Sequence, residues 1–132
     1  MELILEEYHV SEADVLRIVN EPTGAVIQRL RTIGRLMVTA ARAQVGKKSG
    51  ELARSIHYNI QRWNLVPELW VGTWNQIAYL HHEGTRPHEI SARGAHFLRF
   101  SAKGRIVYDR TVMHPGTRPN RFLTDNLYIA RL

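Results

Sequence analysis

Apolar residues recur every three or four positions in two stretches near the start of the chain, which is the spacing of one helix face. The stronger pattern covers Thr23–Val45. The positions on its inward stripe are Val26, Ile27, Leu30, Ile33, Met37, Ala40, Ala41 and Gln44. The weaker pattern begins at Ser11–Asp14, a capping-box sequence, and ends near Asn20 because Pro22 disfavours helix before it. The sequence therefore predicts a short helix followed by a long one.

The pattern then changes to an alternation of apolar and polar residues, which is typical of half-buried strands. Ser55–Trp63 and Glu68–Trp74 flank a turn at residues 64–67, and this arrangement predicts a β-hairpin. The two faces of its second strand are predicted to carry Leu69, Val71 and Thr73 on one side, and Trp70 and Trp74 on the other.

The second half of the chain predicts shorter elements. A helical turn is expected at Gln76–His82 and a closing helix at Asn120–Arg131. Further strands are expected at His88–Ser91, Ala95–Ser101 and Arg105–Tyr108. The inward residues of the closing helix are predicted to be Phe122, Leu123, Leu127 and either Ile129 or Ala130. Together these elements predict an α+β fold: a long helix in the N-terminal half packs on an antiparallel sheet of about four strands, with a short C-terminal helix.

The 132 residues are expected to form a single domain, 1–132, long enough to bury about two thirds of the unfolded surface. The chain contains no cysteine, which excludes disulfides, thiolate metal sites and a catalytic cysteine. No apolar run approaches the roughly 20 residues that span a bilayer, and the acidic N-terminus differs from a basic signal peptide. We therefore expect a protein that is made in a cytoplasm and has no membrane partner.

Charge divides this expected domain into an acidic N-terminal segment, residues 1–21, and a basic α+β core, residues 22–132. The segment has six acidic residues and one arginine, a net charge of −5. The core has 17 basic and six acidic residues, a net charge of +11. Such a division suits head-to-tail contact between identical subunits, a basic surface that faces nucleic acid, or simply a solvated face.

One short sequence occurs twice, 32 residues apart: a His followed two residues later by Gly-Thr-Arg-Pro. The copies run from His82 to Pro87 and from His114 to Pro119. Glycine reaches positive φ without steric cost and proline holds its predecessor extended, so each copy predicts a tight turn. Two copies are too few for a solenoid. We expect two similar connections inside one domain.

Several polar residues have the chemistry of metal binding or catalysis. The second half of the chain contains His81, His82, Glu83, His88, His96 and His114, whose spacing matches no zinc motif. Glu83 and Asp109 have the chemistry of a general acid–base pair. His82, Glu83 and Arg86 have the residue types of a small RNase. Because no pattern selects either set, the sequence predicts no catalytic residues, no metal site and no cofactor.

Short motifs also follow one another in a fixed order along the chain. Residues 45–56 contain Ser49-Gly50, Leu52 and Ser55-Ile56 in the spacing of the pattern Pro-Val-x-Thr-Gly-x-Leu-x-x-Ser-Ile, without its Pro and with Ser in place of Thr. The predicted hairpin then ends in Val71-Gly72-Thr73.

The order continues beyond the hairpin. Ala78-Tyr79 and Glu83-Gly84-Thr85 resemble the pattern Tyr-Ala-x-x-x-Glu-x-Gly-Thr, with the first two residues reversed and without the residue between Glu and Gly. Residues 119–123 match the closing pattern Pro-x-x-Phe-Leu. Over residues 23–130 the chain thus resembles the small head–tail connector family, the neck or tail-completion proteins of long-tailed (siphovirus-type) bacteriophages. The insert between the two Gly-Thr-Arg-Pro copies resembles the actinobacterial-phage branch.

The resemblance implies a structural virion protein without enzymatic activity or cofactor. Such a protein forms a homo-oligomeric ring at the head–tail junction, assembled in the cytoplasm of the bacterial host, and a sixfold ring is favoured over a twelvefold one. Its implied partners are other connector and tail-tube proteins, with genomic DNA passing through the lumen without sequence readout. Two alternatives stay open: a tail terminator that caps the tail tube, and a small basic RNase or metal-dependent nuclease.

The resemblance also implies roles for particular residues. Loops at a ring interface would be shaped by Glu83, Gly84, Thr85, Arg86, Pro87, Gly116, Thr117, Arg118 and Pro119, followed by Phe122 and Leu123 in the closing motif. The candidates to line a DNA channel are Arg35, Arg42, Lys47, Lys48 and Arg54.

Overall fold

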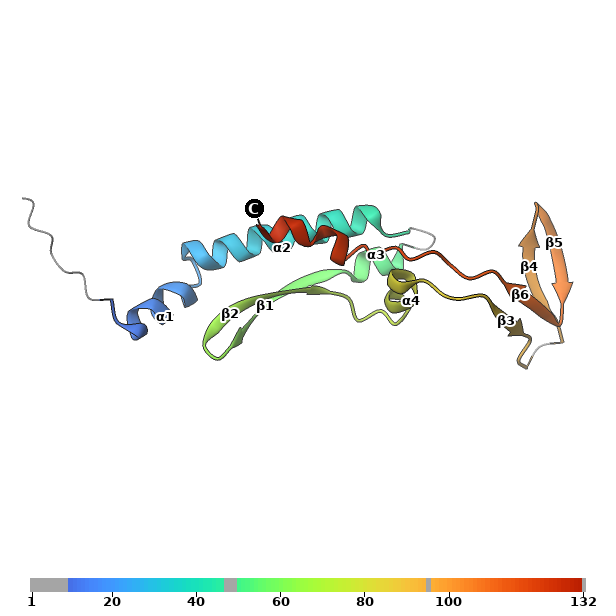
Figure 1. The fold of residues 1–132 in the computed structure, drawn as a ribbon, viewed down its shortest axis with the longest axis horizontal. Helices are drawn as coiled ribbons and strands as arrows, with labels where there is room; N and C mark the ends of the chain where they lie inside the picture. Colours follow the sequence, from blue (N-terminus) through green and yellow to red (C-terminus); the bar gives the residue numbers. More distant parts are fainter. Residues whose placement is uncertain (1–9, 47–49, 95, 132) are drawn as a thin grey trace, which may run out of the picture. The chain divides into compact units, whose positions relative to one another are not determined.

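The computed structural model describes residues 10–46, 50–94 and 96–131, and its fold is α+β, as the sequence predicts. Contacts between residues divide the chain into two compact units (Figure 1). Unit 1 joins residues 1–75 to residues 122–132, and unit 2 is Gln76–Arg121. The sequence predicts a single domain, without this division.

Unit 1 is built around one long helix. Its elements are α1 (Glu12–Asn20), α2 (Ala25–Gln44), α3 (Glu51–Ser55), β1 (His57–Trp63), β2 (Val66–Gly72) and the 3-10 helix η1 (Thr124–Arg131). α2 lies along the antiparallel β1–β2 hairpin, with η1 beside it (Figure 1). Ile33, Met37 and Ile129 form a buried cluster on which Leu69 and Val71 pack. The prediction that Leu69 and Val71 share one face of β2 is therefore confirmed, and this face packs on the core.

Gly34 lets α2 come close to β1. A Cβ atom at this position would lie 2.6 Å from Cδ2 of Tyr58 and 3.0 Å from Cδ1 of Leu69. Glycine inside a helix costs about 1 kcal/mol relative to alanine, so helix propensity alone opposes this residue. The close approach of the Tyr58 ring gives it a packing role.

The two N-terminal helices have nearly the predicted bounds. The Oγ atom of Ser11 accepts a hydrogen bond from the backbone N–H of Asp14 (3.1 Å), which begins α1. α1 ends at Asn20, as the following proline predicts. None of its nine residues is buried, although Val15 and Ile18 are apolar. α1 therefore leaves apolar surface open to solvent.

The closing segment differs from the predicted helix Asn120–Arg131. It is a 3-10 helix that begins at Thr124, with Phe122 fully buried just before it. Because a 3-10 helix has three residues per turn, Asn126 and Ile129 face inward while Leu127 remains 54% exposed. The Asn126 side chain donates to the carbonyl oxygen of Phe122 (2.8 Å) and to Oε1 of Gln44 (3.0 Å), which satisfies its buried amide. The prediction of an inward Leu127 was wrong.

Unit 2 contains one short helix and two antiparallel pairs of strands. Its elements are α4 (Ile77–Glu83), β3 (His88–Ser91), β4 (Leu98–Ala102), β5 (Arg105–Asp109) and β6 (Thr111–His114). β3 pairs with β6, and β4 pairs with β5. The strands of the described residues thus form three separate two-stranded sheets, whereas we expected one sheet of about four strands. The difference arises because β6, which we did not predict as a separate strand, is the partner of β3.

The β3–β6 pairing keeps one register over a longer stretch than the strands themselves. Ser91 lies opposite Thr111 and His88 lies opposite His114. In the same register, Thr85 forms an antiparallel bridge with Thr117. We call residues 85–92 and 110–117 the β-ribbon. The β4–β5 hairpin forms the connection between its two strands.

Candidate functional site

The two Gly-Thr-Arg-Pro copies pair with each other at one end of the β-ribbon. The backbone N–H of Thr85 donates to the carbonyl oxygen of Thr117 (3.1 Å), and that of Thr117 donates to the carbonyl oxygen of Thr85 (3.0 Å). The two threonine Oγ1 atoms lie 3.1 Å apart. The repeat therefore encodes two halves of one paired structure rather than two independent connections.

The two glycines of the repeat make this pairing sterically feasible. Gly84 has φ of 73° and Gly116 has φ of 84°, values that favour glycine. A Cβ atom on Gly84 would lie 2.5 Å from the carbonyl oxygen of Thr117, and one on Gly116 would overlap the carbonyl oxygen of Thr85. Each glycine thus makes room for the threonine of the other copy.

The other residues of the repeat lie at the surface. Arg86, Pro87, Arg118 and Pro119 are all exposed. The His88 ring contacts its own strand, because its Nδ1 lies 2.9 Å from the carbonyl oxygen of Arg86. The structure thus brings the two turns together and leaves both guanidinium groups facing solvent.

The paired turns are joined to α4. This helix ends at Glu83, whose Oε1 lies 2.7 Å from Nδ1 of His82. The backbone N–H of Asn120 donates to the carbonyl oxygen of His81 (3.1 Å), which connects the chain leaving the second copy to the helix before the first.

The closing motif has a packing role in unit 1. Phe122 is fully buried, and Leu123 is half-buried. Leu123 lines an apolar groove of about 530 Å³ together with Leu30, Met37, Leu69, Trp70 and Leu127. The predicted pair thus contributes one core residue and one groove residue.

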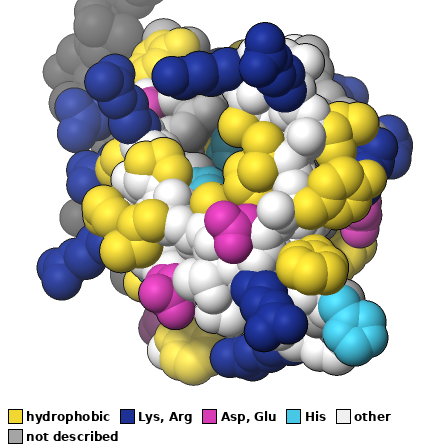
Figure 2. Space-filling view, turned by 90° about the vertical axis from the view of Figure 1, so that its right-hand side faces the viewer, with side chains coloured by type: hydrophobic (Ala, Val, Ile, Leu, Met, Phe, Trp, Pro, Cys, Tyr) yellow, Lys and Arg dark blue, Asp and Glu magenta, His cyan; other side chains and the backbone are white. Residues whose placement is uncertain are grey.

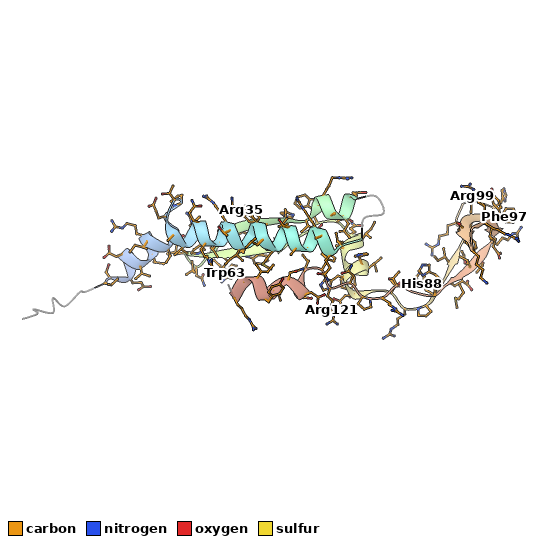
Figure 3. All side chains as sticks on the ribbon, turned by 90° about the horizontal axis from the view of Figure 1, so that it is seen from above. Arg35, Trp63, His88, Phe97, Arg99 and Arg121 are labelled. Carbon is orange, nitrogen blue, oxygen red and sulfur yellow. The ribbon has the colours of Figure 1, made fainter. Side chains whose placement is uncertain are left out.

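The candidates for a DNA channel are only partly gathered. Arg35 and Arg42 are exposed and seven residues apart on α2, so they lie on nearly the same side of that helix (Figure 3 labels Arg35). Nη2 of Arg42 donates to the carbonyl oxygen of Ile56 (2.7 Å), which gives this side chain a structural bond. Arg54 is exposed on α3. Lys47 and Lys48 lie outside the described residues.

Of the catalytic candidates, the structure brings His82 and Glu83 into contact at the end of α4, whereas Asp109 has a local role. Asp109 accepts from the backbone N–H groups of Arg110 (2.7 Å) and Thr111 (3.5 Å), an arrangement that supports a turn. Among the described residues, no group of three His, Cys, Asp or Glu lies close enough to hold a metal ion. The His88 and His114 rings face each other across the β-ribbon, with centroids 5.1 Å apart, but they form only a pair.

The sequence analysis missed an exposed face on the β4–β5 hairpin. Arg99 lies opposite Tyr108 and Ser101 lies opposite Ile106, and all four side chains are exposed. In the same register Phe97 lies opposite Arg110, whose guanidinium carbon is 5.8 Å from the centroid of the Phe97 ring. Figure 3 labels Phe97 and Arg99 on this hairpin. The exposed positions 97, 99 and 101 alternate with the half-buried positions 98 and 100. Apolar residues occur at both kinds of position, which makes this alternation hard to recognise from the sequence.

No known protein family, curated protein or solved structure matches this chain. Within the described residues, no helix is both long and apolar enough to cross a membrane.

Proposed function

We propose that this chain is a non-enzymatic structural protein of a long-tailed bacteriophage, which assembles as a ring at the head–tail junction. The ring joins connectors on the capsid side to the tail tube around the DNA channel. The order and spacing of the sequence motifs suggest this biology. The structure adds a physical reason for assembly, which lies in unit 2.

Unit 2 has almost no buried core, and this observation carries the proposal. Of its described residues, Ala78 alone is buried. A globular domain of about 60 residues buries roughly 60% of the surface that its unfolded chain exposes, so the 45 described residues of unit 2, with one buried side chain, lack the usual source of stability. Exposed strands of this kind are stabilised when another chain covers them.

Unit 1 also exposes residues that monomers usually cover. The three tryptophans of the chain lie on or directly after the β1–β2 hairpin, and their exposed fractions are 66% for Trp63, 56% for Trp70 and 75% for Trp74. Tryptophan is enriched among the residues that dominate protein–protein interfaces. Apolar surface of this kind favours a protein that acts by assembly over one that acts as an isolated enzyme.

The basic charge is concentrated in unit 2. It contains eight Lys or Arg residues and three Asp or Glu residues, a net charge of +5. The face in Figure 2 shows Lys and Arg side chains next to hydrophobic ones. A basic surface without a recognition motif suits either an acidic protein surface or passing DNA.

The first experiment measures the mass of the purified protein by light scattering after size exclusion, at low and moderate salt. Electron microscopy of the same fractions shows whether any oligomer is a ring, and a nuclease assay tests for cleavage. A discrete ring without cleavage is the expected result. A monomer or dimer that cuts nucleic acid, and stops cutting when Glu83→Gln is introduced, would overturn the proposal.

Variants then test the paired turns. Arg86→Ala with Arg118→Ala is expected to weaken assembly, because both guanidinium groups are exposed beside the turns. Arg93→Ala with Arg121→Ala is the matched control, since these exposed arginines belong to the same unit but lie outside the repeat. Equal assembly by both double variants would remove the repeat from the interface.

A further inference from the structure

The exposed face of the β4–β5 hairpin alternates aromatic and cationic side chains. We call Phe97, Arg99 and Ser101 with Ile106, Tyr108 and Arg110 the aromatic–arginine face. Within it, a ring lies opposite a guanidinium in two successive pairs, Phe97 with Arg110 and Arg99 with Tyr108. The other side of the same hairpin carries Leu98, Phe100 and Val107, which are half-buried. One side of the hairpin is thus partly buried, whereas the aromatic–arginine face is exposed to solvent in the described part of the chain.

The side chains of this face favour a partner that offers both apolar surface and carboxylates. Phe97, Ile106 and Tyr108 are 54%, 55% and 63% exposed, so burying them gains free energy from the hydrophobic effect. The guanidinium groups of Arg99 and Arg110 favour carboxylates at the border of the contact. The partner should therefore offer an apolar hollow with a carboxylate at its border.

Unit 1 of the same chain carries such a hollow. It has a volume of about 310 Å³, lies where α1 meets the start of α2, and is lined by Arg17, Ile18, Glu21, Gly24, Ala25 and Val26. Ile18 is 59% exposed there, and Glu21 is exposed beside it. We call this region the α1 hollow.

Charge at larger scale supports the match between the two surfaces. The described residues 10–21, which include α1, carry Glu12, Asp14, Glu21 and Arg17, a net charge of −2, and unit 2 has a net charge of +5. Opposite charges of this size favour encounter between the two surfaces and disfavour contact between two like surfaces. Contact between different surfaces of identical chains is heterologous, and it closes into a ring when the rotation per subunit allows.

We propose that the aromatic–arginine face of one copy binds the α1 hollow of a second copy, in a head-to-tail contact. The proposal rests on the assembly function proposed above and names the surfaces that carry it. Phe97 and Tyr108 enter the apolar hollow, and Arg99 and Arg110 lie beside Glu21, the acidic residue at its border. A nucleic-acid partner would use the two arginines but would leave Ile106 without an apolar contact, so we favour the protein surface.

Two full-length variants test the contact, each with one surface disabled. Arg99→Glu with Arg110→Glu disables the aromatic–arginine face, and Ile18→Gln with Glu21→Gln disables the α1 hollow without giving it a charge that would attract the Glu-substituted face. Lys103→Glu with Arg105→Glu is the matched control, because it makes the same charge change on the same hairpin outside the face. Light scattering after size exclusion measures each protein alone and an equimolar mixture of the two disabled variants, at concentrations up to about 100 µM.

Each disabled variant is expected to be a monomer that self-associates more than about tenfold less than the unmodified chain. Their mixture is expected to form a one-to-one dimer and nothing larger, because one intact copy of each surface remains. Dimer formation also shows that both variants are folded. Raising NaCl from about 0.05 to about 0.5 M should weaken the dimer, since the acidic border is exposed to solvent.

Three results would overturn the inference. Oligomers that form equally well from either disabled variant would show that assembly uses another surface, and the proposed function would survive. A mixture without any dimer would show that the two surfaces do not bind each other. A monomeric chain whose binding to duplex DNA is lost with Arg99→Glu and Arg110→Glu would assign the face to nucleic acid instead.

Discussion

At the scale of single residues, the pairing of the two turns depends on the absence of a side chain at two glycines. Gly84 and Gly116 combine positive φ with a threonine carbonyl oxygen of the opposite copy close to the place that a Cβ atom would occupy. The two requirements are separable, because Gly94 also has positive φ (73°) but has no neighbouring atom within 4 Å of a Cβ. Gly94 therefore provides a built-in reference for the cost of φ alone.

Gly116→Ala is expected to destabilise the β-ribbon more than Gly94→Ala does. The left-handed conformation alone costs an alanine about 1–2 kcal/mol, which applies to both variants. Only the Cβ at position 116 also overlaps the Thr85 carbonyl oxygen. Hydrogen exchange at the Thr85 and Thr117 amides measures the opening free energy of the paired turns. Equal protection of these amides in the two variants would contradict the steric role.

Gly34→Ala is expected to destabilise unit 1 despite the better helix propensity of alanine. The propensity gain is about 1 kcal/mol, whereas overpacking costs about 1–3 kcal/mol, and the Tyr58 ring would lie only 2.6 Å from the new Cβ. Denaturant unfolding followed by tryptophan fluorescence measures the change. In the Tyr58→Ala background the same substitution should become neutral or stabilising. A Gly34→Ala variant more stable than the unmodified chain would show that α2 shifts freely.

At the scale of secondary-structure elements, the features that depend on neighbours in sequence were predicted well. The Ser11 cap, the end of α1 before Pro22 and the apolar stripe of α2 are local patterns, and α2 differs from its predicted bounds by only one or two residues at each end. Pairing between distant strands was not predicted. Thr85 and Thr117 are 32 residues apart, and neither copy contains a local pattern that indicates pairing with the other.

The closing segment shows a second limit of sequence periodicity. Residues 124–131 fit a helical pattern, but the period of 3.6 and the observed period of three assign different inward faces within two turns. Phe122 and Ile129 are buried, while Leu127 is exposed. The exposed face of β4–β5 was missed for a related reason: apolar residues occupy both of its sides, so alternation is hard to recognise.

Because Phe122 is buried and Leu127 is exposed, replacing each side chain with alanine should change stability by different amounts. Phe122→Ala is expected to cost about 3–5 kcal/mol of stability, because it removes a fully buried ring from unit 1. Leu127→Ala, the matched control from the same segment, is expected to change stability by less than about 0.5 kcal/mol. Denaturant unfolding measures the stability of both variants from the shift in midpoint, provided that the m-value is unchanged. A large effect of Leu127→Ala in the monomer would mean that the helical face predicted from the sequence is the correct one.

At the scale of the whole molecule, the two units have different sources of stability. Unit 1 contains the buried cluster of Ile33, Met37 and Ile129. Unit 2 depends on backbone pairing, on the joined turns and on half-buried strand faces. Such a division suits a chain in which one unit folds by its own core and the other is completed by its partners.

Removal of the β4–β5 hairpin should therefore separate folding from assembly. Residues 93–109 are replaced by Asn-Gly, which favours a two-residue hairpin turn and can close the β-ribbon where the Ala92 N–H donates to the Arg110 carbonyl oxygen (2.9 Å). Because all three tryptophans lie in unit 1, their fluorescence reports its unfolding, and we expect an unchanged midpoint for the monomer. We also expect loss of self-association by light scattering, since the aromatic–arginine face is gone. If the shortened chain still assembled like the unmodified one, the hairpin would be dispensable, and the contact between copies would have to be sought on the exposed tryptophans of unit 1.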